Sequence, residues 1–234
     1  RSFSGRAVTF GLDERADVSA RNVRRDGVRG VRFEVKSKSE TIETFLPGGS
    51  TPVLLNALAA IAAAREAGLN LEDAAEGLGK FTPVKGRLNV IEGRWTIVDD
   101  TYNANPASTI AALKFLKMEM RPGRTVCCLG DMRELGTASE RWHRAIGREA
   151  ATLGYDCIVA VGNMAACVAE GAKEGRCPPS RIFVCGTTDE ALGVLREQLQ
   201  PGDGILVKGS RAMAMERVVE GLEEMEETFR GPSS

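Results

Sequence analysis

Two rhythms of apolar residues divide the chain. Up to about residue 47, short runs such as AVTFG and GVRFEVKSKS are rich in strand-forming residues, with Gly and Asp turns between them. Alternating apolar and polar positions are typical of strands with one face in solvent, so we expect a β-meander whose wet face carries Arg and Lys. After residue 50 the period becomes helical, with apolar residues at Val53, Leu54, Ala57, Leu58 and Ile61.

Capping residues mark the ends of two helices in this first part. Ser50 or Thr51 is the expected N-cap of the first helix, and Gly68 is its expected C′ stop. Asn70 is expected to cap a second, shorter helix.

A third pattern begins after the segment TPVKGRLNVIEGRW, in which Gly, Pro and basic residues break the helical period. The strand-like runs WTIVDD, TVCCLGD, DCIVAVG, RIFVCG and GILVKGS are each followed by a helical segment. Strands without polar alternation are buried on both faces, and helical crossovers join parallel strands. We therefore expect two domains, residues 1–83 and 84–234, the second a Rossmann-like, doubly wound α/β domain with a mostly parallel sheet.

Composition narrows the class of protein. The chain has 234 residues, of which 43% are apolar and 27% charged, as in a soluble globular protein. The net charge of −1 gives no basic bias, so we expect no nucleic-acid partner. The longest apolar run, residues 52–64, is interrupted by Asn56, so we expect no membrane insertion.

Six cysteines are present without a CxxC pair, and most lie in or beside the apolar strands. We expect reduced, buried thiols in a cytoplasmic protein rather than disulfides or a zinc site. The single histidine, His143, excludes a multi-histidine metal site, and its place inside a helix disfavours a Ser-His-Asp triad.

Polar residues gather where three strands end, at residues 99–106 (DDTYNANP), 130–134 (GDMRE) and 208–211 (KGSR). Ligands of such sheets bind outside the carboxyl ends of the strands. Asp and Asn at these places also serve as helix caps, and Gly serves in turns. Lys208 fits neither use, and its structural alternative is an ion pair with Asp131. The nucleotide fingerprints G-x-x-x-x-G-K-[ST] and G-x-G-x-x-G do not occur in the sequence.

Several motifs resemble the Mur ligases, the ATP-dependent amide-forming ligases of bacterial cell-wall synthesis. VDDTYNANPAS, CLGDMRELG followed by His143, and LVKGSRAMAMERVV are similar to the C-terminal domain of that family. LPGG with NALAAIAAA, and VKGRL, resemble the end of the central domain and the joint that follows it. YNANP combined with GDMxELG is most similar to the branch that joins D-alanyl-D-alanine to UDP-N-acetylmuramoyl-tripeptide.

The resemblance implies a reaction and its partners. ATP, with Mg²⁺, phosphorylates the carboxylate of the UDP-linked peptide, and the amine of D-alanyl-D-alanine attacks the acyl phosphate. The family's P-loop, magnesium ligands and main catalytic residues lie upstream of the matched region, so the resemblance assigns no metal ligand to this chain. We expect this chain to be an inactive fragment when alone, and a monomer.

The resemblance also implies residue roles. Arg87 would reach the ATP phosphates, Asp100 the ribose and Asn56 the adenine, with Tyr102 and Asn103 beside the nucleotide. In the alternative without a functional role, Arg87 is a solvated charge on the linker, and Asn56 is a polar residue tolerated on an apolar helix. The substrate side would be lined by Asp131, Glu134, Lys208, Ser210 and Arg211.

One departure and two alternatives remain. The family usually has His-Asn shortly before NALAA, whereas this chain has Ser50-Thr51 or Pro52-Val53, depending on the gap. A non-catalytic α/β module that binds a nucleotide or peptide is the first alternative, since no P-loop is present. The second is a sister ligase such as folylpolyglutamate synthetase, against which YNANP argues because that family has a histidine before Asn-Pro.

Overall fold

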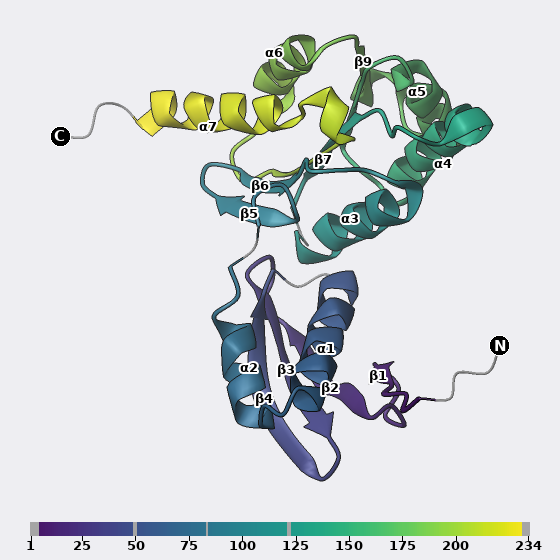
Figure 1. Cartoon of the computed structure of the whole chain (residues 1–234). Coiled ribbons are helices and arrows are strands. Elements are labelled where there is room, and N and C mark those ends of the chain that lie inside the picture. The colour runs from purple at the N-terminus through teal and green to yellow at the C-terminus, as the bar shows by residue number, and fades with distance from the viewer. Residues whose placement is uncertain (1–4, 49–50, 83, 121–122, 231–234) are drawn as a thin grey trace. The chain divides into compact units, whose positions relative to one another are not determined.

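The computed structural model describes residues 5–48, 51–82, 84–120 and 123–230 (Figure 1). The chain splits into two compact units, residues 1–83 and 84–234; the first has one hydrophobic core and the second has two.

The first unit is a four-stranded sheet covered by two helices (Figure 1). Strands β2, β3 and β4 form the predicted antiparallel meander, and a short β1 pairs with β2 in parallel. Phe33 and Val35 of β3 pack with Leu58 and Ile61 of the first helix, which explains the apolar stripe in the sequence. The elements are β1 (Phe10–Gly11), β2 (Val18–Arg25), β3 (Gly30–Ser37), β4 (Glu40–Pro47), α1 (Thr51–Glu66) and α2 (Leu71–Gly79).

The helix ends follow the expected capping chemistry. Asn70 caps α2, because its side-chain oxygen accepts a hydrogen bond from the backbone N–H of Asp73 at 2.7 Å. Gly68 has a φ of +98°, and the N–H of Leu69 closes the end of α1 on the carbonyl of Ala64. Helix α1 begins at Thr51, and the alternative cap Ser50 lies outside the described residues.

The second unit is a six-stranded sheet in the order β5-β6-β10-β7-β8-β9. Five strands are parallel, and β5 runs antiparallel to β6 at one edge. The sequence did not predict β5, because its residues lie in the segment interpreted as the domain joint. The strands are β5 (Asn89–Glu92), β6 (Thr96–Asp100), β7 (Thr125–Gly130), β8 (Cys157–Val161), β9 (Ile182–Cys185) and β10 (Gly204–Lys208).

Helices cover both faces of this sheet (Figure 1). On β6, Val98 joins the core under α3, α4 and α5, whereas its neighbour Ile97 joins the core under α6 and α7. Successive strand residues thus enter opposite cores, which confirms the doubly wound α/β prediction. The helices are α3 (Pro106–Glu119), α4 (Ser139–Thr152), α5 (Ala165–Glu174), α6 (Thr188–Gln198) and α7 (Glu216–Arg230), with 3₁₀ turns at Gly136–Ala138, Pro179–Arg181 and Arg211–Met213.

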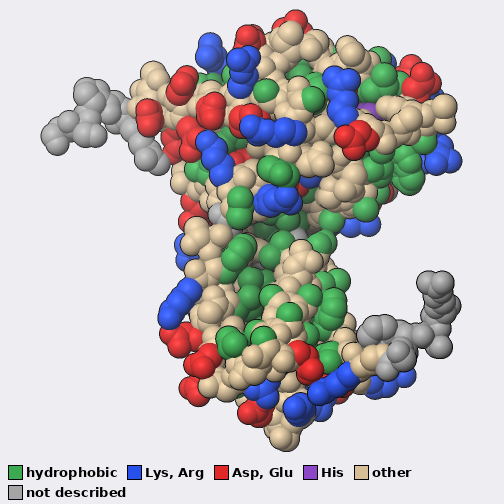
Figure 2. Space-filling model, in the orientation of Figure 1, with side chains coloured by type: hydrophobic (Ala, Val, Ile, Leu, Met, Phe, Trp, Pro, Cys, Tyr) green, Lys and Arg blue, Asp and Glu red, His purple; other side chains and the backbone are tan. Residues whose placement is uncertain are grey.

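All six cysteines are free thiols, as expected, and five of them are buried. Burial raises the pKa of the Cys157 thiol to about 12, so this thiol stays protonated. Acidic and basic side chains are interspersed on the face of the second unit that Figure 2 shows. Within the described residues, no helix is both long and apolar enough to cross a membrane.

Candidate functional site

The strand order brings the three polar strand ends to one edge of the sheet. Strand β10 lies between β6 and β7, with Lys208 in register with Asp100 on one side and Leu129 on the other. The segments that follow β6, β7 and β10 therefore leave the sheet side by side. We call this edge the rim.

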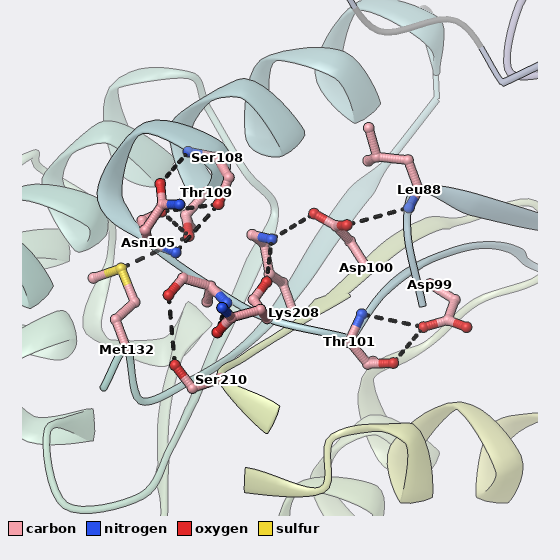
Figure 3. A network of polar contacts seen from close by, with 12 residues as sticks. Leu88, Asp99, Asp100, Thr101, Asn105, Ser108, Thr109, Met132, Lys208 and Ser210 are labelled. Carbon is pink, nitrogen blue, oxygen red and sulfur yellow. Dashed lines mark hydrogen bonds and ion pairs between the residues drawn. The ribbon is translucent and has the colours of Figure 1, made fainter. Parts of the chain in front are cut away.

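Lys208 ties the end of β10 to the end of β6 (Figure 3). Its ammonium donates to Asp100 Oδ2 at 2.5 Å and to the carbonyl oxygen of Asn103 at 2.8 Å, and the side chain is only 2% exposed. The ion pair with Asp131 that the sequence allowed is therefore wrong, because Lys208 pairs with Asp100. Burial raises the pKa of the Asp100 carboxyl above its ordinary value, and the Lys208 ammonium opposes that shift.

Ser210 and Asp131 hold the other strand ends. The hydroxyl of Ser210 accepts from the N–H of Arg133 at 2.8 Å and donates to the carbonyl of Ala104 at 3.5 Å. The Asp131 carboxylate accepts from the N–H groups of Asn163 (3.1 Å) and Met164 (2.9 Å), just before α5. Three candidates predicted to bind substrate, Lys208, Ser210 and Asp131, are thus buried and already hydrogen-bonded within the protein.

Two adjacent acids accept hydrogen bonds from the backbone of the turn that carries Arg87. Asp99 Oδ2 accepts from the N–H of Gly86 at 2.9 Å. Asp100 Oδ1 accepts from the N–H of Leu88 at 3.2 Å (Figure 3). The N–H of Tyr102 donates to the carbonyl of Gly86 at 2.9 Å. Asp99 was not among the residues predicted from the sequence, although the adjacent pair of acids was its signal.

The exposed candidate residues lie outside this hydrogen-bond network. The Arg87 guanidinium lies 4.0 Å from the centre of the Tyr102 ring, a cation–π contact, and the Tyr102 side chain is 47% exposed. Asn103 is exposed next to them, and its side-chain oxygen accepts from the N–H of Ala104 at 2.8 Å. No ion pair between Arg87 and a carboxylate is found in the described part of the chain, so its charge is open to an anion.

The remaining predicted residues differ in their surroundings. Glu134 is exposed and has a φ of +63°, and Arg211 is exposed with its guanidinium 3.1 Å from Glu216. Asn56 belongs to the first unit, where its side chain is exposed on α1. Exposure removes the argument that this asparagine needs a partner inside the protein.

His143 holds the segment that follows β7 in place at the rim. It is buried, and its Nε2 accepts from the N–H of Met132 at 2.8 Å. Its Nδ1 lies 2.8 Å from the carbonyl oxygen of Ser139, which can only accept, so the proton is on Nδ1 and the ring is neutral. The histidine fixes the segment after β7 and takes no part in a nucleophilic triad.

The asparagine-proline pair of the first motif begins α3, as predicted. Asn105 accepts from the N–H of Ser108 at 2.9 Å, the Ser108 hydroxyl accepts from the N–H of Asn105 at 3.2 Å, and Pro106 occupies the first helical position. The polar run at the end of β6 thus has two uses. Its acids and its capping residue build the rim, whereas Tyr102 and Asn103 face solvent.

The rim offers an exposed cation above an aromatic ring, next to the ion pair of Asp100 with the buried Lys208. That arrangement suits a polyanion attached to a flat group. Among the described residues, no group of three or more His, Cys, Asp or Glu side chains is placed to hold a metal ion.

The fold and this rim define a class: open, doubly wound α/β domains that place polar residues at the carboxyl ends of parallel strands. A family described as "Mur ligase, glutamate ligase domain" matches residues 86–211, more than half of the chain. The chain belongs to the Mur ligase family. The resemblance drawn from the motifs is therefore confirmed.

Individual relatives point to one branch of the family. UDP-N-acetylmuramoyl-tripeptide–D-alanyl-D-alanine ligase of Bacillus subtilis is 31% identical over 223 residues, covering 94% of this chain and 48% of that protein. A crystal structure of MurF from Acinetobacter baumannii has a TM-score of 0.81 at 34% identity and covers 93% of this chain and 47% of that one. MurF of Thermotoga maritima in complex with ADP has a TM-score of 0.77 at 26% identity, covering 94% and 49%. This chain spans about half the length of the relatives it matches.

Proposed function

We propose that this chain is the C-terminal part of an ATP-dependent ligase that joins D-alanyl-D-alanine to UDP-N-acetylmuramoyl-tripeptide. The observation that carries the proposal is the open Arg87 guanidinium over Tyr102, held at the rim by two acids. Relatives named for this reaction, one of them solved with ADP, support it.

The proposed reaction has two steps. The γ-phosphoryl group of ATP passes to the terminal carboxylate of the UDP-linked peptide, which gives an acyl phosphate and ADP. The amine of D-alanyl-D-alanine then attacks the acyl carbon, the amide bond forms, phosphate leaves and the amine loses a proton. Such phosphoryl transfer needs positioning and charge neutralisation above all.

Within this scheme the exposed residues contact the small molecules. Arg87 neutralises phosphate charge, and Tyr102 and Asn103 flank the nucleotide. Glu134 and Arg211 face the peptide side. Asp131, Lys208 and Ser210, first predicted to bind substrate, are reassigned to building the rim because they are buried and their polar atoms already bind protein groups.

Two predicted contacts of the nucleotide keep their place in the proposal. Asp100 contacts the ribose through the lone pairs that Lys208 and Leu88 leave open. Asn56 of the first unit contacts the adenine. By the resemblance, Mg²⁺ would be bound by residues upstream of the matched region, and none of these roles depends on it.

The test is phosphate release that depends on ATP, D-alanyl-D-alanine and UDP-N-acetylmuramoyl-tripeptide. We expect none from this chain alone, because its sequence contains no P-loop, and turnover from the protein extended upstream to a natural start. In the extended protein Arg87→Ala should lower kcat/KM for ATP at least about tenfold, since one phosphate-neutralising cation is lost. Arg217→Ala, an exposed arginine of α7 in the same unit, is the control and should stay near wild type.

Two outcomes favour the alternatives. Nucleotide binding without turnover in the extended protein would support the non-catalytic binding module. Turnover with a folate and glutamate in place of the muramoyl peptide would support a folylpolyglutamate synthetase.

The free thiols fit a reducing compartment, so we place the reaction in the cytoplasm. The monomeric state stays a prediction.

A further inference from the structure

The backbone around Arg87 is strained. Gly86 has a φ of +79° and Leu88 a φ of +53°, so left-handed residues lie on both sides of the arginine. A leucine rarely adopts this conformation, because its Cβ then lies too close to the following carbonyl oxygen. Such conformations persist where the surrounding structure over-determines them, and they cluster at functional sites.

Asp99 supplies much of that constraint. Its side chain is 0% exposed, and its two oxygens accept three hydrogen bonds: Gly86 N–H at 2.9 Å, Thr101 N–H at 3.2 Å and Thr101 Oγ1 at 2.6 Å. A carboxylate has two acceptor oxygens and no donor, so it can accept all three hydrogen bonds. An amide or a hydroxyl side chain has only one acceptor oxygen and also carries a donor. None of these donors is a Lys or Arg, and the structure describes no ion pair of Asp99. A buried charge without a cation is costly, which argues that this position serves more than packing.

Close approach leaves the turn little freedom. A Cβ on Gly86 would lie 3.1 Å from the Tyr102 nitrogen and 3.2 Å from Thr101 Oγ1. The backbone of Gly86 is therefore pressed against the segment that follows β6, while the ring of Tyr102 in that same segment carries the Arg87 guanidinium. One segment thus fixes both the backbone and the side chain of the arginine.

We propose that Asp99 is a positioning residue: its buried carboxylate holds the strained turn at residues 86–88 and so presents the Arg87 guanidinium in a fixed place to phosphate. This rests on the proposed function for the identity of the anion. The contacts with Gly86 and Thr101 do not depend on it.

The structural part is tested on this chain by amide hydrogen exchange measured with NMR. Asp99→Ala should speed exchange of the Gly86 N–H about tenfold or more, because the N–H loses its acceptor. Asp203→Ala is the matched control. Asp203 is also a buried acid that accepts a backbone N–H, from Gln200 at 2.9 Å, but it lies at the opposite end of β10. Unchanged protection of Gly86 in Asp99→Ala, or equal loss in both variants, would overturn the proposal.

The functional part is tested by a double-mutant cycle in the ligase extended upstream. Asp99→Ala should raise KM for ATP about tenfold and lower kcat less, since it weakens binding of phosphate before and during transfer. In the Arg87→Ala background the same substitution should change KM less than about twofold, because its effect passes through the arginine. Additive effects would contradict a positioning role, as would a kcat loss with KM unchanged.

Further variants keep failures apart. If Asp99→Ala does not fold, Asp99→Asn keeps the volume, and its KM for ATP should rise only to the extent that Gly86 protection is lost. A rise without such loss would overturn the proposal. If the wild-type extended protein makes no amide, the proposed function fails and the phosphate role fails with it, while exchange at Gly86 still decides whether Asp99 holds the turn.

Discussion

At the scale of single residues, the buried ammonium of Lys208 joins two strand ends by donating to Asp100 and to the Asn103 carbonyl. Lys208→Met keeps the aliphatic stem but leaves the Asp100 carboxylate, which is only 13% exposed, without its cation. We expect it to lower the free energy of unfolding by about 3–5 kcal/mol at neutral pH. The measurement is urea unfolding followed by circular dichroism.

The pH dependence of that variant has a defined sign. Burial already raises the pKa of Asp100, and removing Lys208 removes the cation that lowered it. The folded-state pKa then lies further above the unfolded value, so the variant loses stability as the pH rises through that range and regains it in acid. Adding Asp100→Asn should restore part of the loss at neutral pH. An equal deficit at pH 5 and pH 8 would contradict this account.

At the scale of elements, the cap of α3 connects the first motif to the core. Asn105→Ala removes the acceptor for the Ser108 N–H, and we expect a loss of about 1 kcal/mol in the free energy of unfolding. Asn105→Ser retains an acceptor and should lose less. Chemical denaturation of the two variants side by side measures the difference, and equal losses would show that the cap contributes through something other than this hydrogen bond.

Elements with a strong period were predictable from the sequence, and short ones were not. Helix α1 carries an apolar stripe, and the five parallel strands are uninterrupted apolar runs, so both were found. Strand β5 has four residues that are mostly half-buried and lies between Gly-rich turns, so its signal resembles a linker. Its place is decided by pairing with β6.

The sequence also could not show which carboxylate at the rim pairs with Lys208. The carboxyl ends of parallel strands meet at one edge, which predicted that Asp100, Asp131 and Lys208 would gather there. Which acid takes Lys208 depends on register: Asp100 is directly opposite it, whereas Asp131 lies two residues beyond Leu129 and caps the entry to α5. Asp99 was missed because adjacent strand residues point to opposite faces of the sheet. Only the fold shows that the Gly86 N–H lies on the face to which Asp99 points.

At the scale of the whole molecule, the turn, its two acids and Arg87 all belong to residues 84–234, which have their own pair of cores. We expect residues 84–234 alone to fold cooperatively, with an unfolding enthalpy of about 100 kcal/mol by calorimetry, and to keep the Gly86 N–H protected. A matched piece, residues 89–234, retains every strand of the sheet but lacks the turn. Its Asp99 and Asp100 lose the backbone donors of Gly86 and Leu88, so it should melt several degrees lower.

The two pieces together separate a self-contained unit from one that depends on the rest of the chain. A cooperative transition in residues 84–234, with the Gly86 N–H as protected as in the whole chain, means that the Arg87 turn moves with this unit as one body. Loss of cooperativity in residues 84–234, or melting of both pieces at the same temperature, would contradict a stabilising role of the turn. The first result would also mean that Arg87 is fixed to the second unit, because its anchors at Asp99, Asp100 and Tyr102 all belong to that unit.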